Sequence, residues 1–256
     1  MKSLSVTSVF LLTFAFASLS TGEAQVRLQP SESCSDHSYA AIATLEDANL
    51  AAAIRGALSV GAQDDLTCGL VAGLTELEAQ DAGIESLVGI QNLTSLTNLD
   101  LWPNSITDIS SLSGLTSLTT LDLGVNSITD ISALSELTSL EVLYLNRNSI
   151  TDIGVLSGLT NLTFLHVGAN SITDLSPLRG LTDLTFLNFR ENSVNDISPL
   201  TDLTRLTNLD LTYNSISDIS VLSGMTGHGD PPPLQQPDHG HRLATGDDEP
   251  DGTPCA

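Results

Sequence analysis

The chain has 256 residues, of which 41% are hydrophobic, enough for one sizeable core. Its formal net charge is −23, and Lys2 is its only lysine. Because nucleic-acid binding needs Lys and Arg to displace counterions from phosphates, this balance argues against a nucleic-acid partner. An acidic surface favours cationic partners or ions, although solubility alone is the simpler explanation.

Residues 1–24 have the pattern of a secretory signal peptide. Lys2 supplies the positive start, residues 9–17 form a short apolar run, and small residues precede a cleavage point before Gln25. Cleavage after Ala17 is the alternative. No other segment has the length of a membrane span, so we expect a secreted or periplasmic protein.

Residues 25–44 are predicted to be a linker, and residues 45–73 a helical cap. Residues 45–58 place apolar side chains at helical spacing, with Asp47 or Asn49 available to cap the first turn and Gly61 to end the helix. A shorter apolar run at residues 66–74 is also expected to be helical. Such a segment would cover the open end of a stack of repeats.

Cys34 and Cys68 flank this cap region and form a candidate disulfide, which an exported protein could keep. An unstrained bridge closing a loop of this size would add roughly 3 to 4 kcal/mol of stability. The alternative is two unpaired cysteines, because sequence does not determine connectivity. Cys255 is left over in either case.

Residues 93–224 repeat one 22-residue pattern six times without a gap. Residues 71–92 fit the same register in degenerate form, so the repeats as a whole span residues 74–224. In each unit, leucines such as Leu99 and Leu101 alternate with outward residues, which predicts a short strand with one buried face. Ile106, Ile109 and Leu112 would fill the core as the chain returns. Since one unit cannot bury its own apolar side, the units must stack into a solenoid with a parallel sheet.

Two polar columns recur in every regular repeat. An inward amide can satisfy backbone groups where the strand ends, which is the role expected of Asn104, Asn126, Asn148, Asn170, Asn192 and Asn214. N-capping of a one-turn 3₁₀ or helical segment on the convex side is expected of Asp108, Asp130, Asp152, Asp174, Asp196 and Asp218. A calcium ladder is the alternative, but one carboxylate per unit falls short of the six to eight oxygens that calcium prefers.

These repeats resemble the leucine-rich repeat proteins with 22-residue units, the type found in bacterial internalins and in a phosphatase-1 regulatory subunit. The resemblance covers about residues 45–224, including the helical cap. It implies an α/β solenoid with parallel strands on the concave face and short 3₁₀ or helical turns on the convex face. It also implies protein recognition on the concave face, which is extracellular in internalin-like members.

The outward strand positions should carry any specificity, because they are free to vary. Aromatic residues and an arginine cluster at these positions in the middle repeats, a composition typical of interface hot spots. The candidate partner-binding residues are Trp102, Tyr144, Phe164, His166, Phe186, Asn188 and Arg190. The alternative for Phe164 and Phe186 is that they merely stack on each other along the sheet.

We expect a binding protein without catalytic, cofactor or metal sites. His166 lies between Tyr144 and Asn188, but no nucleophile with a base, metal cluster or phosphate loop accompanies it. A structural surface protein that self-associates through its uncapped C-terminal end is the second interpretation.

Residues 225–256 break the repeat and are predicted to be a disordered tail rich in Pro, Gly and Asp. When the codons are read one base later from His228, suitable choices permit another repeat with its leucines, Asn, Ile and Asp in place. We therefore hypothesise a single-base frameshift, which the DNA sequence would decide.

Overall fold

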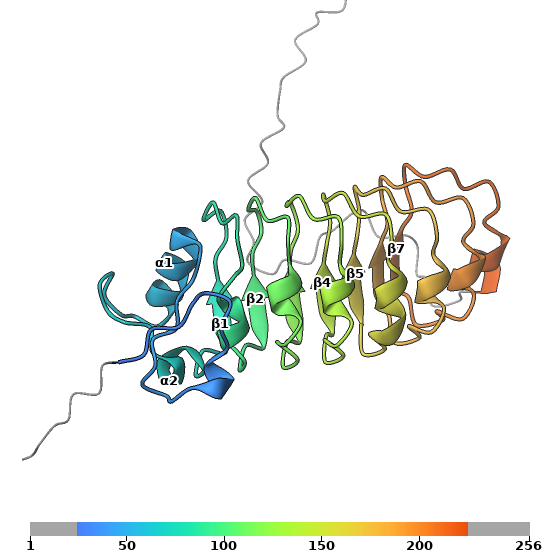
Figure 1. Cartoon of the computed structure of the whole chain (residues 1–256). Coiled ribbons are helices and arrows are strands. Elements are labelled where there is room, and N and C mark those ends of the chain that lie inside the picture. Colours follow the sequence, from blue (N-terminus) through green and yellow to red (C-terminus); the bar gives the residue numbers. More distant parts are fainter. Residues whose placement is uncertain (1–24, 225–256) are drawn as a thin grey trace, which may run out of the picture.

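The computed structural model describes residues 25–224 (Figure 1). The predicted signal peptide, the tail and the hypothesised frameshift lie outside these residues. Seven parallel strands lie side by side in chain order in one sheet. They are β1 (Glu76–Glu78), β2 (Asn98–Asp100), β3 (Thr120–Asp122), β4 (Val142–Tyr144), β5 (Phe164–His166), β6 (Phe186–Asn188) and β7 (Asn208–Asp210).

Short 3₁₀ turns run along the side opposite the strands (Figure 1). One such turn follows each of the seven strands. In chain order they are η2 (Ile90–Asn92), η3 (Ser110–Leu112), η4 (Ser132–Leu134), η5 (Gly154–Gly158), η6 (Ser176–Leu178), η7 (Ser198–Leu200) and η8 (Ser220–Gly224). Each residue of β1–β6 pairs with the residue 22 positions later in the next strand, as Leu99 does with Leu121. The predicted solenoid with parallel strands and short turns is confirmed.

The core is a continuous column of aliphatic side chains inside the solenoid. Leu99 and Leu101 are 1% and 0% exposed, and Ile106, Ile109 and Leu112 are equally buried from the other side. The same positions are buried in the following four repeats. Each such side chain contributes about 1.5–3 kcal/mol on full burial, so stacking is the main source of stability.

The asparagine column links consecutive repeats through the backbone. Nδ2 of Asn148 donates to the carbonyls of Leu123 and Leu145, at 2.9 and 3.1 Å. Its Oδ1 accepts a hydrogen bond from the amide of Ile128, at 2.9 Å. The other five asparagines repeat this pattern toward the preceding repeat. The predicted role of the inward amide is confirmed.

The aspartate column caps the convex turns from one residue farther away than predicted. Oδ1 of Asp108 accepts the amide hydrogen of Ser110, at 2.8 Å, while the N-cap residue itself is Ile109. The other five aspartates make the same bond to the residue two positions later. N-capping in the strict sense is therefore wrong, because the buried isoleucine occupies the N-cap position and leaves the carboxylate to close the turn from outside.

The cap contains two helices beside β1 (Figure 1). Helix α1 (Ala48–Ala57) lies within the predicted range and ends before Gly61, and α2 (Cys68–Val71) lies within the second predicted run. Asp47 caps α1 by accepting the amides of Asn49 and Leu50 on Oδ1. Its Oδ2 accepts the amides of Glu85 and Ser86, at 2.8 and 3.2 Å, so one carboxylate joins the cap to the first repeat.

Residues 25–44 are part of the cap, and the predicted linker is wrong. Leu28, Ala41 and Ala43 are buried, and Ile42 bridges the backbones of Arg27 and Thr67. The short turn η1 (Cys34–Asp36) follows within this segment. These aliphatic side chains cover the end of the solenoid core, which explains why the segment folds rather than remaining extended in solvent.

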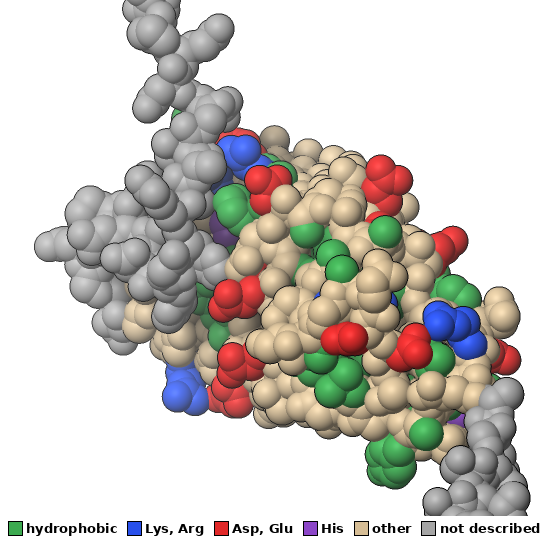
Figure 2. Space-filling model, turned by 90° about the vertical axis from the view of Figure 1, so that its left-hand side faces the viewer, with side chains coloured by type: hydrophobic (Ala, Val, Ile, Leu, Met, Phe, Trp, Pro, Cys, Tyr) green, Lys and Arg blue, Asp and Glu red, His purple; other side chains and the backbone are tan. Residues whose placement is uncertain are grey.

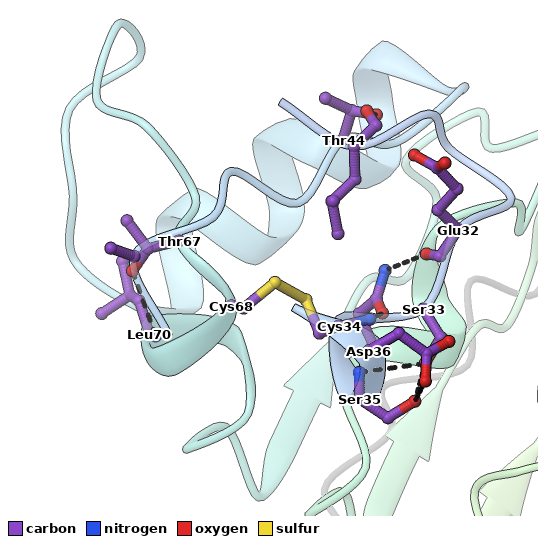
Figure 3. The surroundings of a disulfide bond; sticks show 12 residues. Glu32, Ser33, Cys34, Ser35, Asp36, Thr44, Thr67, Cys68 and Leu70 are labelled. Carbon is purple, nitrogen blue, oxygen red and sulfur yellow. Dashed lines mark hydrogen bonds between the residues drawn. A yellow bond between two sulfur atoms is a disulfide. The ribbon is translucent and has the colours of Figure 1, made fainter. Parts of the chain in front are cut away.

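A disulfide joins Cys34 in η1 to Cys68 in α2, with the two Cα atoms 5.4 Å apart (Figure 3). Asn92, which is 2% exposed, supports it from the first repeat. Its Oδ1 accepts the amide of Cys34 at 2.6 Å, and its Nδ2 donates to the carbonyl of Glu32 at 3.2 Å. The bridge therefore ties together two cap segments that rest on the same repeat.

The two ends of the described solenoid differ in burial. Seen from the cap end, acidic side chains are spread over a polar surface and hydrophobic ones occupy small separate areas (Figure 2). In the last described repeat, Leu209, Leu211 and Ile216 are only half-buried, and Tyr213 and Ile219 are 69% and 65% exposed.

Within residues 25–224, no helix combines the length and apolar character needed to cross a bilayer.

Candidate partner-binding face

The concave strand face consists of the outward side chains of β1–β7 and of the residue two positions after each strand. Each of the strands β1–β6 buries its central leucine and presents the residues on either side of it, because successive side chains of a strand point to opposite faces. In-register pairing then arranges the outward residues in columns. For example, Tyr144 lies beside His166, and Phe164 lies beside Phe186.

Three aromatic rings form a continuous stack across β4, β5 and β6. The rings of Phe164 and Phe186 are parallel within 6°, with centroids 4.1 Å apart. The ring of Tyr144 packs against Phe164 at 4.7 Å with an interplanar angle of 42°. The mutual stacking expected under the alternative interpretation is therefore present. All three side chains remain partly exposed, so stacking leaves an apolar surface on the face.

His166 and Tyr144 are both neutral near pH 7. Burial lowers the pKa of His166 to about 4, and the charge of Arg147 adds to this effect while Asp210 opposes it. Burial raises the pKa of Tyr144 to about 12, with further contributions from the charges of Asp122 and Asp100. The two rings meet edge-on at 6.1 Å. The His166 side chain is partly buried.

Glycines two residues after β3 and β5 leave room for larger neighbouring side chains. A Cβ at Gly124 would come within 2.8 Å of Asn146 Oδ1 and 2.9 Å of a carbon of the Trp102 ring. A Cβ at Gly168 would come within 3.0 Å of Asn188 Oδ1 and 3.2 Å of His166 Nε2. Both glycines therefore leave room for candidate partner-binding side chains: Gly124 for Trp102, and Gly168 for His166 and Asn188.

Several residues at the last position of a strand also have a structural role that was not predicted. Oδ1 of Asn188 accepts the amide hydrogen of Arg190 at 3.0 Å. The aspartates at the corresponding positions do the same, with Trp102, Gly124 and Thr212 as donors to Asp100, Asp122 and Asp210. The signal was in the sequence, since Asp or Asn occupies this position in four of the six regular repeats. Asn188 is therefore only partly free to act on a partner.

Arg190 points toward the C-terminal end of the face. Its Nε lies 3.1 Å from a carboxylate oxygen of Glu191, and its guanidinium lies 4.6 Å from the centroid of the Tyr213 ring. The hydrogen bond to Glu191 raises the pKa of Arg190 above its ordinary value. Arg190 is thus a cation already engaged by an acid and a ring, a combination that sequence spacing did not predict.

Five of the seven predicted site residues form one group on three adjacent strands. They are Tyr144, Phe164, His166, Phe186 and Asn188. Trp102 stands apart, just after β2, and Arg190 lies at the far edge, just after β6. Among residues 25–224, no three or more His, Cys, Asp or Glu side chains gather closely enough to hold a metal ion.

Comparisons with known proteins place the repeat pattern in a family. The family model described as "Leucine Rich repeats (2 copies)" matches residues 94–136, 138–180 and 182–224, which together make up half of the chain. A search of curated proteins finds no significant match.

Among the solved structures that match this chain, two illustrate the similarity over the repeats. A crystal structure of internalin C2 from Listeria monocytogenes has 37% identity and a TM-score of 0.61, over 71% of this chain and 91% of that one. A leucine-rich repeat protein of Leptospira interrogans has 26% identity and a TM-score of 0.59, over 62% of this chain and 43% of that one. The chain therefore belongs to the leucine-rich repeat family and is internalin-like among its members.

Proposed function

We propose that this chain is a binding module that recognises a protein partner on its concave strand face, rather than an enzyme. The observation that carries this proposal is the stack of Tyr144, Phe164 and Phe186, which keeps apolar ring surface partly exposed in the middle of the face. Aromatic side chains at the centre of a rigid surface are typical of interface hot spots. Because the rings already hold one another in place, binding costs little further side-chain entropy.

The test is affinity capture of secreted and cell-envelope proteins with the full chain, followed by mass spectrometry. The variant carrying Tyr144→Ser and Phe186→Ser should lose the captured partner while keeping the wild-type circular dichroism and melting temperature. Val155→Ser is the matched control, because it removes apolar surface from η5 on the opposite side. A partner that the double variant retains as well as the wild type does would refute this use of the face.

The proposed site of action is outside the cytoplasm. The Cys34–Cys68 disulfide supports it, since such bonds persist in oxidising compartments. The predicted signal peptide at residues 1–24 points the same way. Expression with and without those residues, followed by mass measurement of the protein in the medium or periplasm, tests export. Retention of residues 1–24 in an exported, folded protein would contradict the predicted cleavage.

Self-association is the second candidate, favoured by the exposure of Tyr213 and Ile219 in the last described repeat. Apolar surface of this kind is a common contact between subunits. Sedimentation at several concentrations should show a concentration-dependent increase in mass, which Tyr213→Ser with Ile219→Ser should reduce. A single monomeric species at all concentrations would exclude this candidate.

A further inference from the structure

The aromatic stack of the strand face presents ring edges rather than ring faces. The planes of Phe164 and Phe186 are parallel within 6° and their centroids lie 4.1 Å apart, so each ring covers one face of the other. Tyr144 packs against Phe164 from the opposite strand neighbour, at 4.7 Å. Since all three side chains are partly exposed, they leave mainly ring edges to a partner. A ring edge carries partial positive charge, which suits the face of another ring or a carboxylate oxygen.

One cation adjoins this stack without an ion-pair partner in the described part of the chain. Arg147 follows β4 by three residues, and its side chain is exposed. Its charge reaches the next strand: burial lowers the pKa of His166, and Arg147 adds to this effect while Asp210 opposes it. The three ion pairs found within residues 25–224 all involve other arginines. Arg147 is therefore available to an acidic group of a partner.

The two repeats beside Arg147 bring no carboxylate to this part of the face. Residues 142–148 and 164–170 contain no Asp or Glu. Tyr144, with a pKa of about 12, and His166, with a pKa of about 4, are both neutral at pH 7. Arg147 is thus the only side chain in these two ranges that is charged near neutral pH.

Acidic side chains lie on either side of these two repeats. Asp122 at the end of β3 and Asp210 at the end of β7 are the next outward acidic residues of the strands. Glu141 comes directly before β4, at the other end of that strand from Arg147. Charges more than about 8 Å away are largely screened at physiological ionic strength. The net charge of −23 therefore bears less on a group bound at Arg147 than Arg147 itself does.

The second arginine at this edge of the sheet already has a partner. Nε of Arg190 lies 3.1 Å from a carboxylate oxygen of Glu191. The amide of Arg147 donates to the carbonyl of Gly168, at 2.8 Å. The amide of Ala169 donates to the carbonyl of Arg190, at 2.7 Å, so two small residues separate the two arginines along the edge. Arg147 is the one of the two that is left for a partner.

We propose that the partner of the strand face is a protein segment in which a carboxylate side chain lies close to an aromatic one. The aromatic side chain would lie across the ring edges of Phe164 and Phe186, and the carboxylate would pair with the guanidinium of Arg147. This inference rests on the proposed function and specifies the class of partner. Burial against the rings would supply most of the affinity, while the ion pair would add specificity.

The geometry of the face limits the spacing of these two side chains in the partner. Arg147 lies three residues beyond Tyr144, which is at most about 11 Å of extended chain. A partner therefore needs no more than about three residues between its ring and its carboxylate. Anionic membranes are disfavoured, because a single arginine does not offset the repulsion from a molecule with a net charge of −23.

The experiment uses the full chain and three fluorescently labelled seven-residue peptides. The first is Glu-Ser-Phe-Ser-Phe-Ser-Glu, which offers a carboxylate beside a ring in either chain direction. The second replaces both Glu residues by Lys, and the third replaces both Phe residues by Ser. Fluorescence anisotropy at physiological ionic strength measures binding. The first peptide should bind at least about tenfold more tightly than either of the others.

The deciding variant reverses the charge at one position. Arg147→Glu should weaken the first peptide about tenfold or more and make the second peptide the tighter binder. Glutamate is compatible with this left-handed position, since φ is 54° at Arg147 and 57° at Glu191, which occupies the same place two repeats later. The matched control is Arg179→Glu, an exposed arginine next to η6 on the convex side, which changes net charge equally. It should leave both affinities unchanged.

The two proposals can fail separately. Equal binding of the three peptides, no binding of the first, or equal effects of Arg147→Glu and Arg179→Glu would overturn the acidic-aromatic partner. The proposed function would still stand if Tyr144→Ser with Phe186→Ser abolished capture of a partner. If that double variant captured normally, the proposed function would fail, and with it the assignment of the partner class to this face.

Discussion

At the scale of single residues, the repeat asparagines connect neighbouring units rather than only closing their own turn. Asn148 satisfies the carbonyls of Leu123 and Leu145 and the amide of Ile128. Two of these three groups belong to the preceding repeat. Leaving several buried backbone groups without partners is costly, because they lost their water when the solenoid formed.

We therefore predict that Asn148→Ala lowers the free energy of unfolding by about 2–4 kcal/mol. Chemical denaturation with circular dichroism measures this loss. Asn146→Ala is the matched control two residues away, on the strand face, and should change stability by less than about 0.5 kcal/mol. Equal effects of the two substitutions would show that the hydrogen bonds of the asparagine column contribute little.

His166 should make the solenoid sensitive to acid. Its pKa is about 4 in the folded chain, below the ordinary value of 6.5, so the unfolded chain binds the proton more readily. Its contribution to stability is complete above pH 6.5 and is lost as the pH falls toward 4.

We predict that His166→Asn flattens the decline of the melting temperature over this interval and leaves the pH 8 value equal or higher. Asparagine occupies the same column at Asn188, where it accepts a backbone amide. An identical pH profile for the variant and the wild type would assign the acid sensitivity to other groups.

At the scale of elements, one carboxylate holds the cap to the repeats. Oδ1 of Asp47 caps α1, while Oδ2 accepts the amides of Glu85 and Ser86. Partial burial opposes ionisation, but the amides of Glu85, Leu50, Ser86 and Asn49 together outweigh it and lower the pKa of Asp47 below 3.8. The stability from this group is present above pH 3.8 and declines as the pH falls through the lower, folded value.

Asp47→Asn separates the two functions of this side chain, because asparagine caps helices well but has only one acceptor oxygen. We predict a loss of about 1–3 kcal/mol, with faster hydrogen exchange in α1 and at residues 85–86. Helix α1 should still form. Asp64→Asn, a change of the same charge elsewhere in the cap, serves as the control. Unchanged exchange at residues 85–86 would contradict the joining role of Oδ2.

At the scale of the whole molecule, stability should decline along the solenoid. Leu143, Leu145 and Ile150 are 0% exposed, whereas their counterparts Leu209, Leu211 and Ile216 are only half-buried. Because each repeat contacts only its neighbours, the last described unit, with these half-buried side chains, gains less from burial than the middle units do.

Hydrogen exchange of the full chain should therefore show protection at β4 and β5 that exceeds protection at β7 by about tenfold or more. Tyr213→Ser, which changes an exposed side chain, is expected to leave β4 and β5 unaffected. Uniform protection from β2 to β7 would indicate that the solenoid unfolds as one cooperative unit.

The sequence alone predicted those features that repeat. The strand leucines, the inward asparagines and the pairing of Phe164 with Phe186 all follow from a period of 22 residues, because the same environment recurs in each unit. Residues 25–44 occur once, so no periodicity revealed that they pack into the cap. Left-handed backbone at Val125, Ala169 and Glu191, with φ of 50°, 54° and 57°, was equally hidden. Their residue types do not favour that conformation, and the stack imposes it.

The constant register of the sheet has a consequence for how such a chain can change over generations. Every asparagine reaches back the same distance, from Asn104 to Ala79 and from Asn148 to Leu123. Loss or duplication of one whole unit would therefore rebuild the same junction, whereas an exchange of any other length would break it. Recombination between near-identical repeats could thus shorten or lengthen the strand face by whole units of 22 residues, without a new fold.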